Sequence, residues 1–210
     1  MTGDRKSSSG RFHIFHLRHS HDHQNLIHLL NELLRIFLNF HDVWTNTVNV
    51  TRRAYHSIDK YILENAFELG KEGSTAITAM LINSQTLVVA NVGDSRALSV
   101  DHEPNREREI IESKGGFVSN IPGDVPRIDG KLAVARAFGD KSLKRHISLD
   151  PNVAIELINN DVDLIILASD GLWKVIISNQ EAVNCIKNMK DAKAATKHFI
   201  RSGDFVEKQG

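Results

Sequence analysis

Short apolar runs separated by polar triplets mark the middle of the chain. Residues 76–82 and 86–92 are rich in Val, Ile, Thr and Leu, and Asn83, Ser84 and Gln85 separate them. Such runs on either side of a polar turn are typical of paired, buried β-strands. The pattern therefore predicts a β-hairpin here. By the same criterion we predict a short strand at residues 12–15 and a second strand pair at 152–158 and 163–168, around the polar residues 159–161.

Helical periodicity occupies the segments between these strands. Ile27, Leu30, Leu33, Leu34 and Phe37 recur at helical spacing, which predicts an amphipathic helix half-buried against a sheet. Capping and termination signals predict four further helices. One begins at Thr45 or Asn46 and stops at Gly70, and a second covers 107–114 and stops at Gly115-Gly116. A third runs from the Ser178/Glu181 capping box through Ile186, and the last covers 192–201. Strand pairs separated by helices indicate an α+β fold with antiparallel sheets. Residues 1–11 are predicted to be a disordered N-terminus and residues 12–210 one domain.

Composition excludes several classes of partner and site. The chain of 210 residues has 26 basic and 26 acidic residues, so no net charge attracts nucleic acid or anionic membranes. Cys185 is the only cysteine, which excludes an internal disulfide framework, and its apolar neighbours predict a buried helix residue. The N-terminus has no apolar leader segment. We expect a soluble intracellular protein of the cytoplasm or nucleus, without nucleic-acid or membrane partners.

Two aspartates are candidates for holding a hard cation. Asp170 follows the predicted strand at 164–168 and precedes Gly171, while Asp94 follows the strand at 87–92 directly after Gly93. A carboxylate at a strand end, beside a glycine that permits close backbone approach, suits Mg²⁺ or Mn²⁺. The alternative for either residue is a turn-forming aspartate that bonds its own backbone.

The order of several motifs is far more specific than either aspartate alone. GSTA (73–76), VANVGDSRA (89–97), VDHEP (100–104), LAVARAFGD (132–140) and ASDGLWKVIISNQEAV (168–183) follow one another. Over roughly residues 12–199 this order resembles the plant branch of the protein phosphatase 2C family. The resemblance implies an α-β-β-α sandwich of two antiparallel sheets flanked by helices. It also implies hydrolysis of phosphoserine and phosphothreonine in proteins by water activated between two Mn²⁺ or Mg²⁺ ions.

The family's central metal motif is changed in this chain. Where the family has Asp-Gly-His, the segment FHIFHLRHSHDHQNLI (12–27) places His16, Leu17 and Arg18. A histidine cannot replace an anionic bridging ligand for a hard cation, and a fixed arginine charge repels cations. Asp170 and Asp94 are the ligand positions that remain. We therefore expect severely weakened metal binding and identify no catalytic residue.

Two further expectations follow from the same resemblance. The family's N- and C-terminal edge strands, which carry other metal and phosphate ligands, have no counterpart here, so we expect an incomplete sandwich. Arg136 and Asp140 match family positions, and their interpretation as determinants of the fold outweighs a catalytic one.

Three functions remain open from the sequence. The chain is a residual phosphatase, a pseudophosphatase that binds protein kinases or phosphoproteins without hydrolysing them, or the non-functional product of a decaying or mis-assembled gene. A separate hypothesis concerns a histidine cluster that suits Zn²⁺, Ni²⁺ or Cu²⁺ better than Mg²⁺. The cluster extends from His13 to His23, and its candidate ligands are His19, His21 and His23 with His16 and Asp22. The alternative is sequence drift in a decayed motif.

Overall fold

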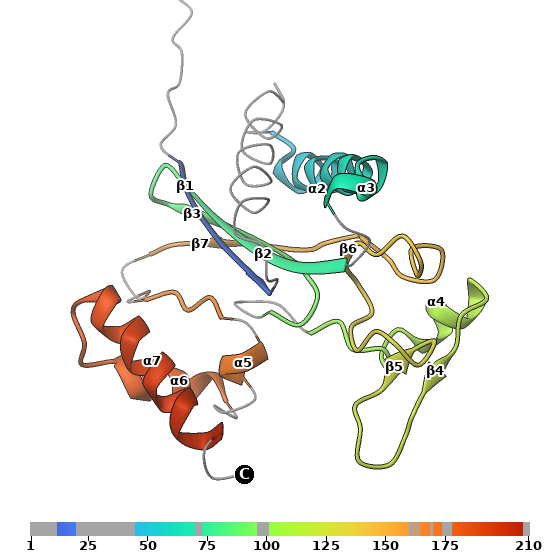
Figure 1. The fold of residues 1–210 in the computed structure, drawn as a ribbon. Coiled ribbons are helices and arrows are strands. Elements are labelled where there is room, and N and C mark those ends of the chain that lie inside the picture. Colours follow the sequence, from blue (N-terminus) through green and yellow to red (C-terminus); the bar gives the residue numbers. More distant parts are fainter. Residues whose placement is uncertain are drawn as a thin grey trace, which may run out of the picture.

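The structure is a computed structural model that describes most of the chain (Figure 1). The described residues are 12–19, 45–69, 73–95, 101–159, 162, 164–168, 170–173 and 178–207. For residues 12–19, 69, 170 and 200–207 the description covers the backbone only. The predicted disordered N-terminus at 1–11 and the predicted helix over 27–37 lie outside the described residues.

A five-stranded antiparallel sheet forms the centre of the fold. Its main path runs β1-β2-β3-β7, and β6 pairs with the start of β2. The strands are β1 (Phe12–His19), β2 (Gly73–Ile82), β3 (Thr86–Val92), β6 (Phe138–Gly139) and β7 (Asn152–Leu157). The predicted hairpin is confirmed as β2 and β3. Asn83 and Ser84 adopt positive φ angles of 52° and 57° in its turn, which the twist of a tight hairpin favours.

One face of the sheet is covered by α2 (Thr47–Glu64). Tyr55 and Ile58 of α2 pack on Ala90 and Val92 of β3 and on Phe138 of β6. The helix predicted from Thr45 or Asn46 is confirmed over α2, with Asn46 at its N-cap, but it breaks at Asn65 before α3 (Ala66–Leu69), and its predicted stop at Gly70 lies outside the described residues. The Tyr61 carbonyl accepts from both the backbone N–H and the side-chain amide of Asn65, at 3.0 and 2.8 Å, where α2 ends. Phe67, predicted on the apolar face, lies after this break and is 99% exposed.

The opposite face of the sheet carries the C-terminal helices, as Figure 1 shows. They are α5 (Asp170–Trp173), α6 (Asn179–Ile186) and α7 (Ala192–Glu207). The predicted capping box is confirmed, because Ser178 and Glu181 bond each other's backbone at the start of α6. The predicted burial of Cys185 is wrong: α6 buries Ala182 and Ile186, and the cysteine is exposed.

A smaller unit projects from the sheet. It contains α4 (Arg108–Ser113) and the two-stranded sheet of β4 (Val118–Ser119) and β5 (Arg127–Ile128). The predicted glycine stop of α4 is confirmed: the N–H groups of Gly115 and Gly116 donate to the Glu112 and Ile111 carbonyls, and Gly115 has φ of 83°. Its separate core includes Ile111, Val118 and Ile128.

Two strand predictions need correction. The predicted pairing of 152–158 with 163–168 is wrong, because β7 pairs with β3. The free edge of β3 offers β7 a complete ladder, and Leu167 instead packs on the apolar face formed by Ile77, Ala79, Leu87 and Val89. The strand predicted at 12–15 is longer: β1 continues to His19 along the edge of β2.

The α+β class with antiparallel sheets and flanking helices is thus confirmed. Among the helices that the structure describes, none combines the length and the apolar character needed to cross a lipid bilayer.

Candidate functional site

The segment that stands at the family's central metal motif lies within β1. His16, Leu17 and Arg18 are register partners of Thr78, Ile77 and Ala76 in β2. Ala76 is in turn the partner of Val92 in β3. Arg18, Ala76 and Val92 therefore form one row across three strands, and the chain reaches Asp94 two residues after that row. The topology places the arginine position and the strand end before Asp94 in one register row, with β2 between them.

Asp94 sits in a tightly packed turn at the end of β3. Gly93, directly before it, has φ of 114°, a conformation that side chains rarely adopt. A Cβ atom at Gly93 would lie 2.3 Å from Cβ and Cγ2 of Thr75. Only glycine fits, so β2 and β3 themselves set where the half-buried Asp94 is placed.

A buried histidine holds the same turn from the other side. The backbone N–H of His102 donates to the Gly93 carbonyl at 3.1 Å, and Nδ1 of its ring lies 3.1 Å from the Gly93 nitrogen and 3.0 Å from the Gly93 carbonyl oxygen. Burial lowers the pKa of His102 to about 4, and the nearby Arg136 charge adds to this effect. The ring is therefore neutral at physiological pH, and its Nδ1 accepts from the Gly93 N–H or donates to the Gly93 carbonyl according to the tautomer.

Asp170 is the first residue of α5, not the residue after a strand, because residues 164–167 before it form no strand. Nearby, Nε1 of Trp173 donates to the Ala168 carbonyl at 3.1 Å, which ties the end of this short helix to the segment that precedes it. The side chain of Asp170 lies outside the described part of the chain. Its assignment as a metal ligand, like that of Asp94, stays a prediction.

The side chains that the structure describes do not supply the donor set that a pair of Mn²⁺ or Mg²⁺ ions needs. Such ions need several carboxylate oxygens to offset their mutual repulsion. Among the described side chains, no group of three or more His, Cys, Asp or Glu residues could hold a metal ion. On the β1 segment, His16 supplies a neutral or cationic ring and Arg18 a fixed positive charge.

Arg136 and Asp140 have structural partners. Nε of Arg136 donates to Oε1 of Glu107 at 2.6 Å, and Nη1 donates to the Asp150 carbonyl, so Arg136 joins the start of α4 to the segment before β7. Asp140 accepts hydrogen bonds from the Ser142 hydroxyl and the Leu143 N–H, at 2.9 and 3.2 Å. Both sets of contacts agree with the prediction that these residues determine the fold.

Only part of the histidine cluster lies within the residues that the structure describes. His13, His16 and His19 take register positions on β1 opposite Leu81, Thr78 and Thr75. His21, His23 and Asp22 lie outside the described residues. A metal site in this cluster stays a hypothesis.

An apolar cavity of about 320 Å³ lies elsewhere, between the sheet and the C-terminal helices. Leu87, Leu157, Ile158 and Trp173 are among its lining residues, and Glu156 is the one charged residue in the lining. Neither Asp94 nor Asp170 lines it, so the cavity is not the candidate site.

Sequence reasoning missed His102, the residue that positions the candidate turn. The sequence did contain a sign of this residue, because the motif VDHEP (100–104) follows VANVGDSRA in the motif order that resembles the family. The motif order does not reveal what the His102 ring contacts, since a histidine nine residues after a glycine can face solvent as easily as the turn.

Comparisons with known proteins place the chain in a family. The family model Protein phosphatase 2C matches residues 4–202. The chain is 56% identical over 200 residues to Probable protein phosphatase 2C 39 of Arabidopsis thaliana, covering 90% of this chain and 68% of that protein. It is 56% identical over 205 residues to Probable protein phosphatase 2C 62 of Oryza sativa subsp. japonica, covering 90% and 69%.

A solved structure agrees at the level of the fold. The crystal structure of serine-threonine phosphatase 2C from Toxoplasma gondii superposes with a TM-score of 0.74 at 22% identity, covering 95% of this chain and 80% of that chain. Together with the family match over nearly the whole sequence, these similarities show that the chain belongs to the protein phosphatase 2C family.

Proposed function

We propose that this chain keeps the scaffold of the family while its metal-dependent hydrolysis of phosphoserine and phosphothreonine is absent or severely reduced. The observation that carries the proposal is the β1 segment, where His16, Leu17 and Arg18 stand in place of the family's Asp-Gly-His. Arg18 shares a register row with Val92, two residues before Asp94. A fixed positive charge on the segment that holds the metal motif in the family disfavours a divalent ion bound at that segment through Coulomb repulsion.

Phosphate release from a phosphopeptide tests this proposal directly. The purified chain should show no turnover above a buffer blank with Mn²⁺ or Mg²⁺, in the presence of okadaic acid. Manganese-dependent turnover that disappears in an Asp170→Ala variant would overturn the proposal. Circular dichroism of both proteins ensures that a lack of turnover reflects a folded chain.

Restoring the family motif gives a matched comparison. The variant His16→Asp/Leu17→Gly/Arg18→His gains a carboxylate at position 16. It also removes the Leu17 side chain and the Arg18 charge, which both hinder cation binding. Titration calorimetry with Mn²⁺ should detect tighter binding by this variant than by the natural chain. Equal affinities would show that the β1 segment is not what limits metal binding.

The role that fits an inactive scaffold is binding without hydrolysis, with phosphoproteins or protein kinases as partners in the cytoplasm or nucleus. It is supported by the separate cores of the central sheet and of the unit that contains α4, which leave the scaffold well packed. Calorimetry with matched phosphorylated and unphosphorylated peptides distinguishes it, because binding should require the phosphate. A molten or aggregated product would instead favour the non-functional gene product.

A further inference from the structure

β7 forms one edge of the central sheet. Within the described part of the chain its strand partner is β3, on one side. The Ile158 N–H, directly after β7, donates to the Gln85 carbonyl beside β3 at 2.7 Å. Successive residues of a strand direct their backbone groups to opposite edges. Residues 152, 154 and 156 therefore bond to β3, and Val153, Ile155 and Leu157 direct their N–H and C=O groups away from it.

The outer edge of β7 is also apolar and exposed. Ile155 is 45% and Leu157 76% exposed, so the described part of the chain leaves a large share of both side chains open to solvent. Glu156 is the single charged residue of the strand. Edge strands of soluble proteins usually carry lysine, proline or a bulge that blocks pairing, and an apolar edge without them pairs readily with another strand.

We propose that two copies of this chain associate edge to edge through β7, as an antiparallel pair centred on Ile155. In this register Ile155 lies opposite Ile155 of the second copy, and Val153 lies opposite Leu157. Each of these pairs exchanges both of its backbone hydrogen bonds, because all three residues direct those groups outward. Glu156 lies opposite Ala154, which keeps the two carboxylates apart.

The neighbouring registers are each disfavoured by a named residue. A pair centred on Glu156 would place the two Glu156 carboxylates directly opposite each other, which is destabilising. A pair centred on Ala154 would place Leu157 opposite Pro151, which has no N–H group to donate. The strand is therefore complementary to a second copy of itself in one register. This self-complementarity selects a second copy of the chain over a strand from another protein.

Sedimentation velocity of the full chain over a range of micromolar concentrations tests the association. Ile155→Pro removes an outward N–H group and no hydrogen bond to β3, and Ile155→Lys places two like charges at the symmetry axis. Each should weaken dimerisation by about tenfold or more. Ile121→Lys, at an isoleucine 57% exposed on the loop between β4 and β5, is the matched control and should leave it unchanged.

Cysteine cross-linking tests the register, in a Cys185→Ser background that removes the natural thiol. Ile155→Cys should form an intermolecular disulfide, because hydrogen-bonded partners lie about 5.5 Å apart between Cα atoms. Asn152→Cys should not, since the symmetry axis separates the two copies of residue 152 by about 20 Å along the strands.

Several outcomes would overturn the proposal. They are a chain that stays monomeric at every concentration, a dimer that persists in both Ile155 variants, polydisperse aggregates in place of a dimer, and a disulfide through residue 152. If the chain stays monomeric and its β7 edge pairs with an extended strand of a different protein, the proposal is also overturned, because that protein and not a second copy is then the partner of β7.

Discussion

Nδ1 of His102 lies 3.1 Å from the Gly93 nitrogen and 3.0 Å from the Gly93 carbonyl oxygen, so one ring nitrogen contacts both backbone groups of the turn that carries Asp94. The Gly93 carbonyl already accepts from the Asn91 amide at 3.3 Å and from the His102 N–H at 3.1 Å. With these donors already on the carbonyl, the neutral tautomer in which Nδ1 accepts from the Gly93 N–H suits the turn. Protonating the ring would remove this acceptor and would bury a positive charge near Arg136.

We expect stability to fall as the pH drops from about 6.5 towards 4. The pKa of His102 is lowered from 6.5 to about 4 by burial, with Arg136 as a further cause. The unfolded chain then takes up a proton within this window and the folded chain does not. Full stability is thus present above pH 6.5 and is lost progressively down to about pH 4, by up to about 3 kcal/mol.

Urea unfolding at several pH values between 7 and 4 measures this loss. His102→Asn keeps an acceptor for the Gly93 N–H and cannot be protonated, so its stability should change less with pH in the same window. If the natural chain and the variant gave parallel pH profiles, another group would be responsible.

Gly93→Ala should destabilise the fold far more than Gly123→Ala. Both glycines have positive φ, at 114° and 84°. A Cβ atom at Gly93 would lie 2.3 Å from two Thr75 atoms, whereas a Cβ at Gly123 would have nothing within 4 Å. We expect a loss of about 1–2 kcal/mol for Gly123→Ala from backbone strain alone, and more than about 4 kcal/mol for Gly93→Ala. Thermal unfolding measures both, and similar losses would contradict the role of Thr75.

Local signals predicted the elements whose causes are local. The β2–β3 hairpin follows from two apolar runs around Asn83 and Ser84, and the start of α6 follows from Ser178 and Glu181. The glycine stop of α4 depends equally on residues close in sequence. Each of these devices depends on contacts within a few residues, so the sequence alone contains the information.

Relationships between distant segments could not be predicted in the same way. The apolar run at 163–168 has the composition of a strand, but β7 pairs with β3, a choice made by tertiary packing. For the same reason the burial of His102 and the exposure of Cys185 could not be read from their neighbours. At the candidate site, the changed motif at 16–18 was visible in the sequence, whereas the register row that relates Arg18 to Val92 required the sheet.

A buried ion pair should contribute strongly to the attachment of α2. Oδ1 of Asp59 accepts from Nζ of Lys144 at 2.7 Å and from the Gly139 N–H at 2.8 Å. Burial lowers the pKa of Lys144, partly opposed by the bond to Asp59. Asp59→Ala leaves both donors without this acceptor, and we expect a loss of about 3 kcal/mol in the free energy of unfolding.

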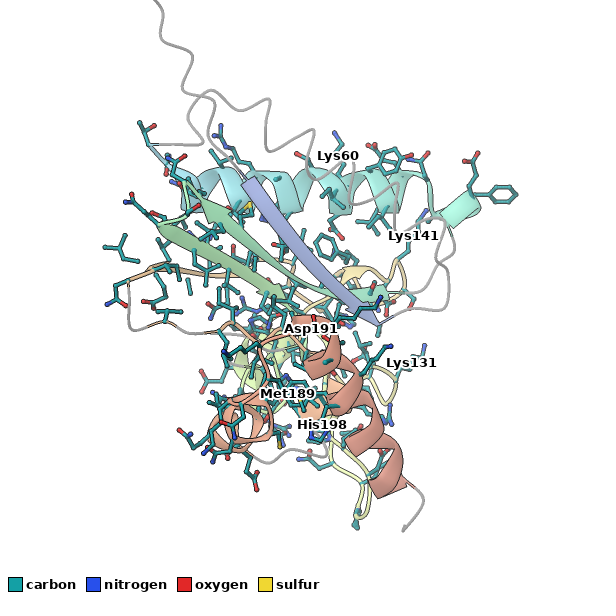
Figure 2. All side chains as sticks on the ribbon, turned by 90° about the vertical axis from the view of Figure 1, so that its left-hand side faces the viewer. Lys60, Lys131, Lys141, Met189, Asp191 and His198 are labelled. Carbon is teal, nitrogen blue, oxygen red and sulfur yellow. The ribbon has the colours of Figure 1, made fainter. Side chains whose placement is uncertain are left out.

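The pair of Lys60 and Glu64 on the same helix is the control. Its atoms lie 3.8 Å apart, the Lys60 side chain is 75% exposed, and Figure 2 shows Lys60 on the side of α2 away from the sheet. Lys60→Met should cost less than about 0.5 kcal/mol. Urea unfolding of both variants provides the comparison, and equal costs would show that burial of the Asp59–Lys144 pair is not important.

Divalent metal ions should leave the thermal stability of the natural chain unchanged. An ion that binds the folded state alone stabilises it by about 2.7 kcal/mol at a concentration one hundred times its dissociation constant. Because His16 and Arg18 replace the family's ligands, we expect no rise in the unfolding temperature with millimolar Mn²⁺ or Mg²⁺ and no fall on adding a chelator. A rise with Zn²⁺ or Ni²⁺ alone would assign binding to the histidine cluster, which imidazole chemistry favours. A clear rise with Mn²⁺ that disappears in Asp94→Asn would instead show that a hard-cation site survives beside the Arg18 row.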